Sequence, residues 1–95
     1  MEELRNVHIL VDGRVQGVGF RYFVKNKAAE LHITGWVRNR FDERIEILAQ
    51  GTETDLTRFI AAVRIGPESA LVTELVTDWP PTDVRFDRFS VAPSI

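Results

Sequence analysis

The sequence contains no cysteine, which excludes a disulfide framework, a thiolate metal site and a cysteine nucleophile. Its two histidines, His8 and His32, lie far apart without the spacing of metal ligands, so we expect neither a metal nor another cofactor. No apolar run approaches the length that spans a membrane, and residues 1–5 (MEELR) lack the apolar segment of a secretion signal. We therefore expect a cytoplasmic protein without membrane association.

The chain also has little net charge. Twelve basic and 14 acidic side chains give a formal net charge of −2 and a pI near 5.6, so no broad electrostatic attraction draws the protein to nucleic acid or to an anionic membrane. Any anion binding must be local. A length of 95 residues with 44% hydrophobic content suits a single core, so we expect residues 1–95 to form one domain.

Hydrophobic periodicity predicts the secondary structure. Alternating apolar residues indicate strands over 6–12, 34–39 and 45–50, whereas spacings of three and four indicate helices over 20–31 and from Thr52 to Gly66. Residues 70–79 contain apolar pairs that do not alternate, which indicates a bulged strand. A short last strand is expected within 86–91.

This order of elements, β-α-β-β-α-β with a terminal strand, is typical of the ferredoxin-like α+β fold. Right-handed crossovers then place both helices on one face of an antiparallel sheet. We also expect His32 to end the first helix in a left-handed conformation, a four-residue loop near Arg40–Glu43, and a loose tail from Pro93 to Ile95.

The stretch GRVQGVGFR, residues 13–21, lies between the first strand and the first helix. Its glycines permit backbone angles closed to other residues, and the amides before a helix can converge on an anion. Arg21 adds a permanent charge whose planar fork matches two oxygens of a phosphate or a carboxylate. The expected phosphate-binding loop comprises Val15, Gln16, Gly17, Val18, Gly19 and Phe20.

Five blocks of the sequence together resemble the acylphosphatase family. They are GRVQGVGFR (13–21), TGWVRN (34–39), AQG (49–51), GPESA (66–70) and FDRFSV (86–91). The resemblance implies an enzyme with sheet order 4-1-3-2 that hydrolyses small acyl phosphates to a carboxylate and inorganic phosphate. It also implies that Arg21 binds the phosphoryl group and that Asn39 holds the attacking water. We also expect a monomer that acts without a metal, with a phosphate oxygen of the substrate accepting the proton of the water.

Two alternatives stay open. The chain could be a non-catalytic anion-binding module, as acylphosphatase-like domains are within larger carbamoyl-transfer enzymes. The same order of elements also serves RNA recognition motifs, which stack bases on aromatics of the two central strands. Residues 45–50 contain no aromatic, and the outer face of the first strand offers His8, Leu10 and Asp12, so we expect no nucleic-acid binding.

Overall fold

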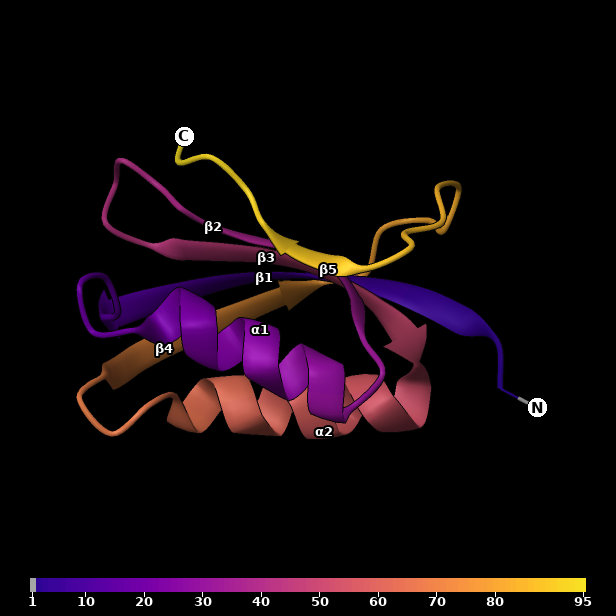
Figure 1. The fold of residues 1–95 in the computed structure, drawn as a ribbon, viewed down its shortest axis with the longest axis horizontal. Coiled ribbons are helices and arrows are strands. Elements are labelled where there is room, and N and C mark those ends of the chain that lie inside the picture. The colour runs from indigo at the N-terminus through magenta and orange to yellow at the C-terminus, as the bar shows by residue number, and fades with distance from the viewer. Residues whose placement is uncertain (1) are drawn as a thin grey trace.

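Residues 2–95, which the computed structural model describes, form a five-stranded sheet with two helices packed on one face (Figure 1). This arrangement confirms the predicted ferredoxin-like α+β fold. Neither helix combines the length and the apolar character that a membrane-crossing helix requires. The elements are β1 (Leu4–Arg14), α1 (Phe20–Glu30), β2 (Thr34–Asn39), β3 (Ile45–Thr52), α2 (Glu53–Ile65), β4 (Leu71–Asp78) and β5 (Phe89–Val91).

The strands follow the order β4-β1-β3-β2-β5, which confirms the expected order 4-1-3-2 of the first four strands. Strand β1 pairs antiparallel with β3 and β4, and β2 pairs antiparallel with β3. The terminal strand β5, whose pairing the sequence does not predict, lies parallel to β2, so the sheet is mixed. The segment 79–88 carries the chain from one edge of the sheet to the other (Figure 1).

The core lies between the sheet and the helices. Val7, Ile9 and Val11 of β1 are fully buried, as their alternation predicts, and every second residue of β3 from Ile45 joins them. Burial of each valine or isoleucine among them stabilises the fold by about 1.5–3 kcal/mol relative to an exposed side chain. From the helices the core receives Phe20, Val24, Ala28, Leu56, Phe59 and Val63.

Two predicted helix boundaries are confirmed. The Thr52 hydroxyl accepts a hydrogen bond from the Asp55 amide at 3.2 Å and so caps the start of α2. His32 follows α1 with a φ of 58°, the left-handed conformation expected where the helix ends without a glycine.

The bulge predicted for β4 is also present. Asp12 pairs with Glu74 whereas Gly13 pairs with Val72, so Thr73 is an extra residue in β4. The backbones approach so closely here that a Cβ on Gly13 would lie 2.0 Å from the Leu71 carbonyl oxygen. This glycine is therefore required by the strand pairing that precedes the loop.

The connection between β2 and β3 differs from the predicted four-residue loop. The Arg40 amide donates to the Arg44 carbonyl at 2.9 Å, which leaves three residues, 41–43, at the tip. Glu43 adopts a φ of 73°, and a left-handed residue after a turn is the usual way to close a three-residue hairpin. The connection therefore has three residues at its tip instead of four, and the turn forms without a glycine.

The tail over residues 93–95 is held against this connection, so the prediction of a loose tail was wrong. The Ile95 amide donates to the Asn39 carbonyl at 3.1 Å, and the Phe41 amide donates to the Ile95 carbonyl at 2.6 Å. These bonds continue the parallel pairing of β5 with β2 and bring the tail beside the end of β2.

Candidate active site

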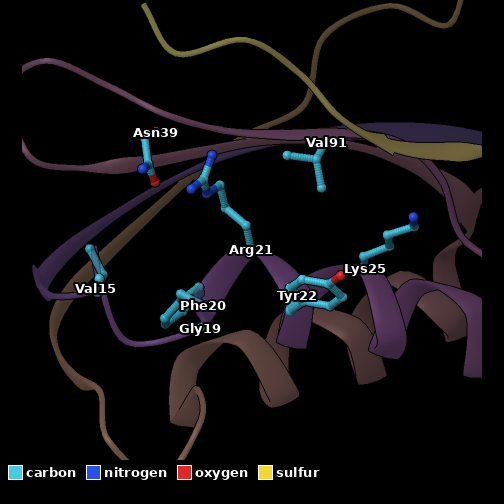
Figure 2. A pocket seen from close by; sticks show the side chains of 9 residues that line it. Val15, Gly19, Phe20, Arg21, Tyr22, Lys25, Asn39 and Val91 are labelled. Carbon is cyan, nitrogen blue, oxygen red and sulfur yellow. The ribbon is translucent and has the colours of Figure 1, made fainter.

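A hollow of about 370 Å³ opens between the glycine loop, the first turns of α1, the end of β2 and β5 (Figure 2). Because β1 and β2 both flank the central strand β3, the loop after β1 and the last residue of β2 meet at the same end of the sheet. The hollow is lined by Val15, Gly17, Gly19, Phe20, Arg21, Tyr22, Lys25, Asn39 and Val91.

The loop reaches α1 through two left-handed glycines. Gly17 has a φ of 73° and Gly19 a φ of 78°, and a Cβ on either would meet no atom within 4 Å. Glycine is therefore needed for its backbone angles and not for space. A run of amides in such conformations forms a concave anion site at the positive end of the helix.

The backbone amides at the start of α1 are not capped by a side chain of the helix itself. Its N-cap residue Gly19 supplies no side-chain hydrogen bond, and the first turn carries no acidic residue. The first amides of a helix have no partner within the helix. These donors and the positive helix end therefore favour an external anion at this position.

Arg21 extends from the first turn of α1 into the hollow (Figure 2). Within residues 2–95 its guanidinium forms no hydrogen bond or ion pair, in contrast to Arg5, Arg38, Arg40 and Arg44, which all contact carboxylates. A partly exposed guanidinium in this position offers its full set of donors to a ligand.

Asn39 is the last residue of β2, and its side chain faces that of Arg21 across the hollow (Figure 2). Its Oδ1 atom is buried and accepts no hydrogen bond from the described part of the chain. Buried polar atoms almost always have a partner, and exceptions often occur at functional sites. The hollow thus contains an unpaired acceptor opposite an unpaired cation.

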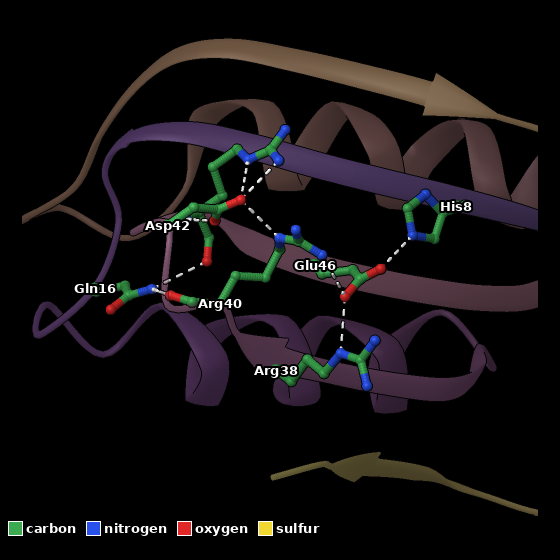
Figure 3. A network of polar contacts seen from close by, with 7 residues as sticks. His8, Gln16, Arg38, Arg40, Asp42 and Glu46 are labelled. Carbon is green, nitrogen blue, oxygen red and sulfur yellow. Dashed lines mark hydrogen bonds and ion pairs between the residues drawn. The ribbon is translucent and has the colours of Figure 1, made fainter. Parts of the chain in front are cut away.

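The structure brings most of the predicted site residues together. Arg21, Asn39 and four residues of the loop line the hollow, whereas the side chains of Gln16 and Val18 do not. Val18 packs against the core. The Gln16 amide nitrogen donates to the Arg40 carbonyl at 2.8 Å and to the Arg44 carbonyl at 3.0 Å, and so ties the loop to the β2–β3 connection (Figure 3).

Three lining residues were missed by sequence reasoning: Tyr22, Lys25 and Val91. Lys25 could have been found, because it lies four residues after Arg21 and such residues share a helix face. Val91 could not, since its place depends on the parallel pairing of β5 with β2.

A polar network covers the opposite face of the sheet (Figure 3). The buried Glu46 carboxylate contacts His8 Nε2 at 2.6 Å and Arg38 Nε at 2.7 Å. Burial raises the pKa of Glu46, but hydrogen bonds with His8 and Arg38 outweigh it, so the pKa lies below its ordinary value. The guanidinium of Arg38 also lies 4.5 Å from the centre of the Trp36 ring, a distance typical of a cation–π contact.

The same network continues into the β2–β3 connection. Asp42 accepts hydrogen bonds from Arg44 and from Arg40, and these bonds hold the pKa of its carboxyl far below the usual range. In residues 2–95 no three His, Cys, Asp or Glu side chains gather closely enough to hold a metal ion. Neither face therefore presents a protein-built metal centre within this range.

Comparison with known proteins gives consistent matches. The acylphosphatase family model matches residues 7–91. An acylphosphatase of Bacillus subtilis is 54% identical over 67 residues, which are 70% of this chain and 74% of that protein. The crystal structure of acylphosphatase from Bacillus subtilis superposes with a TM-score of 0.90 at 44% identity and covers 95% of this chain and 99% of that one.

A second kind of structural neighbour is much larger. Full-length HypF, in its phosphate- and nucleotide-bound form, contains a segment that matches with a TM-score of 0.91 at 27% identity. The match covers 99% of this chain but only 12% of HypF. The fold therefore also occurs as one part of a longer polypeptide.

Proposed function

Because this chain belongs to the acylphosphatase family, we propose that the hollow between α1 and β2 is its catalytic site. The protein is an acylphosphatase, an enzyme that hydrolyses the carboxyl–phosphate bond of acyl phosphates. The observation that carries the assignment of the site is the pair of unpartnered groups, the Arg21 guanidinium and the Asn39 Oδ1 atom, facing one another beside an uncapped helix start.

The reaction divides an acyl phosphate into two anions. Water oxygen forms a bond to phosphorus while the bond from phosphorus to the carboxyl oxygen breaks, and the electron pair of that bond leaves with the carboxylate. A carboxylate is a stable anion near neutral pH, so departure requires little acid assistance. The task of the protein is to hold the phosphoryl group and to bring water in line with it.

The loop and Arg21 are suited to the first part of this task. Amides of Val15 to Phe20 at the positive end of α1 bind the phosphoryl oxygens, and the Arg21 fork binds two of them. Charge that develops on these oxygens in the transition state is stabilised by donors that are already in place, without reorganisation of solvent.

Asn39 is suited to the second part. Its Oδ1 atom accepts a hydrogen bond from the attacking water and thereby fixes the position of the water oxygen relative to phosphorus. No carboxylate or histidine lines the hollow among residues 2–95. The proton of the water therefore passes to a phosphoryl oxygen of the substrate, and the products are the carboxylate and inorganic phosphate.

The assignment is tested by release of inorganic phosphate from benzoyl phosphate with EDTA present. We expect the wild type to be active and Arg21→Ala to lose about 10³-fold or more in kcat, as for other arginines that stabilise a transferring phosphoryl group. Lys27→Ala, on the same helix but outside the hollow, serves as the matched control. Near-native turnover by Arg21→Ala would refute the role of Arg21, and loss of wild-type activity in EDTA would refute metal independence.

The similarity to a segment of HypF favours one second candidate, a non-catalytic module that binds an anion in the same hollow. Binding of phosphate without hydrolysis of benzoyl phosphate would support this candidate over the first. For the enzyme we further propose a single domain over residues 1–95, a monomer in the cytoplasm that acts on small acyl phosphates and binds no nucleic acid.

A further inference from the structure

The hollow is larger than a phosphoryl group requires. Its volume of about 370 Å³ falls in the range of roughly 300–1,000 Å³ that is typical of sites for whole small molecules. The loop, Arg21 and Asn39 account for one end. Tyr22, Lys25 and Val91 line the remainder, and the proposed hydrolysis assigns no role to any of them.

Lys25 is the charged group of this second end. It lies one turn after Arg21 on α1, and both residues line the hollow, with the Arg21 side chain extending toward Asn39 and the Lys25 side chain extending away from it (Figure 2). Among residues 2–95 no carboxylate lies within ion-pair distance of its ammonium group. The hollow therefore has a cation toward each end, one assigned to the phosphoryl group and the other unassigned.

Lys27 differs in each of these respects, although it lies on the same helix. Its ammonium group is 3.6 Å from the Glu30 carboxylate and 5.7 Å from the centre of the Phe23 ring. It does not line the hollow. Of these two lysines of α1, therefore, Lys25 lines the hollow without an ion-pair partner, whereas Lys27 is paired and lies outside it.

The surroundings of Lys25 are apolar and open. Tyr22 is 76% exposed and Val91 is 44% exposed, and both border the hollow. An acyl group extending from the phosphoryl site would contact these side chains before its far end reached the ammonium group. Four residues of helix separate the backbones of Arg21 and Lys25 by about 6 Å along the axis, and because the two side chains diverge, the distal anion lies farther than this from the phosphoryl group.

We propose that Tyr22, Lys25 and Val91 form an acyl-binding subsite that favours acyl phosphates whose acyl group ends in a second anionic group. This inference rests on the proposed function. In such a substrate the phosphoryl group occupies the loop, the hydrocarbon part lies against Tyr22 and Val91, and the distal anion lies beside Lys25. Exposed ion pairs are worth up to about 1 kcal/mol, so the preference is modest and sensitive to salt.

The test compares two substrates of equal size, 4-carboxybenzoyl phosphate and its neutral analogue 4-carbamoylbenzoyl phosphate. The measured quantity is the ratio of their kcat/KM values, which cancels general effects of a substitution on the phosphoryl site. At low salt we expect Lys25→Gln to lower this ratio about 2- to 5-fold, mainly through KM of the carboxylate substrate. In 0.5 M NaCl, where the Debye length is only a few ångströms, we expect the difference to disappear.

Lys27→Gln is the matched control, because it removes the same charge from the same helix outside the hollow. An unchanged ratio in Lys25→Gln, an equal decrease in Lys27→Gln, or a decrease that persists in high salt would overturn the proposal. Lys25 is exposed and Lys27 is partly exposed, and circular dichroism verifies that the variants are folded. If the wild type hydrolyses neither substrate, the proposed function fails; if it hydrolyses both with an unaltered ratio, only the subsite fails.

Discussion

Asn39→Ala should reduce activity and increase stability, two effects that a purely structural residue would not combine. The Oδ1 atom of Asn39 is buried, and residues 2–95 supply it with no donor. A buried acceptor without a partner costs about 1–3 kcal/mol. Even if an ordered water satisfies it in solution, immobilising that water costs up to about 2 kcal/mol.

The change in stability and the change in activity of Asn39→Ala can each be estimated. Alanine keeps the Cβ atom of Asn39 and its backbone bond to the tail, so little apolar contact is lost. We expect the free energy of unfolding to rise by about 1 kcal/mol, which corresponds to an increase in Tm of about 4–8 °C for a domain of this size. Loss of one preorganised polar contact to the reacting group should lower kcat about 10²- to 10³-fold, equivalent to about 2.7–4 kcal/mol.

Two measurements on the same preparation decide the matter: thermal unfolding followed by circular dichroism, and steady-state hydrolysis of benzoyl phosphate. A lower Tm together with an equal loss of activity would mean that Asn39 only forms the turn after β2. A higher Tm with near-native kcat would mean that its side-chain oxygen does not hold the attacking water. Either result would refute the role assigned to Asn39.

Three further predictions follow from contacts outside the phosphoryl site. Gln16→Ala removes both bonds between the loop and the β2–β3 connection, and we expect a loss of about 10- to 100-fold in kcat for benzoyl phosphate with the fold retained. Gly35→Ala places a Cβ 1.9 Å from the Leu48 carbonyl oxygen at a φ of +130°, so we expect urea unfolding to report a loss of at least about 2 kcal/mol. Because the folded-state pKa of Glu46 lies below its ordinary value of 4.5, its charge stabilises the fold above that pH, and this contribution disappears as pH falls through the folded-state value. We expect urea unfolding between pH 7 and pH 3 to show a smaller loss of stability in Glu46→Gln than in the wild type.

Each of these predictions has a result that contradicts it. Unaltered kinetics in Gln16→Ala would mean that the loop keeps its geometry without the link. A Gly35→Ala variant as stable as the wild type would mean that β2 and β3 can separate locally at no cost. Parallel pH profiles for the wild type and Glu46→Gln would mean that Glu46 has the same pKa in the folded and unfolded chains.

Much of the fold was predictable because local patterns and global packing agree. The bounds of β2 match the predicted strand over 34–39, and α2 begins and ends at the predicted signals. Arg21 and Asn39 were predicted from resemblance to act at one site, and they meet because β1 and β2 flank β3 and end at the same side of the sheet. In these segments short-range sequence information was sufficient.

The remainder depends on contacts between residues far apart in the chain. The parallel pairing of β5, the tail bonds to Asn39 and Phe41, and the link from Gln16 to the β2–β3 connection involve backbone groups, which leave no signature in side-chain periodicity. The ends of β1 were also underestimated, since Leu4 and Arg14 extend it by pairing with β3 and β4. Hydrogen bonds of this kind are visible only once the topology is known.

The bulge in β4 affects the tendency of the protein to aggregate at high concentration. Strand β4 forms one border of the sheet, so its outer backbone groups could template a strand of a neighbouring molecule, and Leu71 and Val76 are 62% and 50% exposed there. The extra residue Thr73 disturbs the regular spacing that such templating needs, and Glu74 adds a negative charge beside it. Growth of intermolecular β-structure from this border is thereby opposed while the chain remains folded, and straightening the strand by deletion of Thr73 should promote fibril formation.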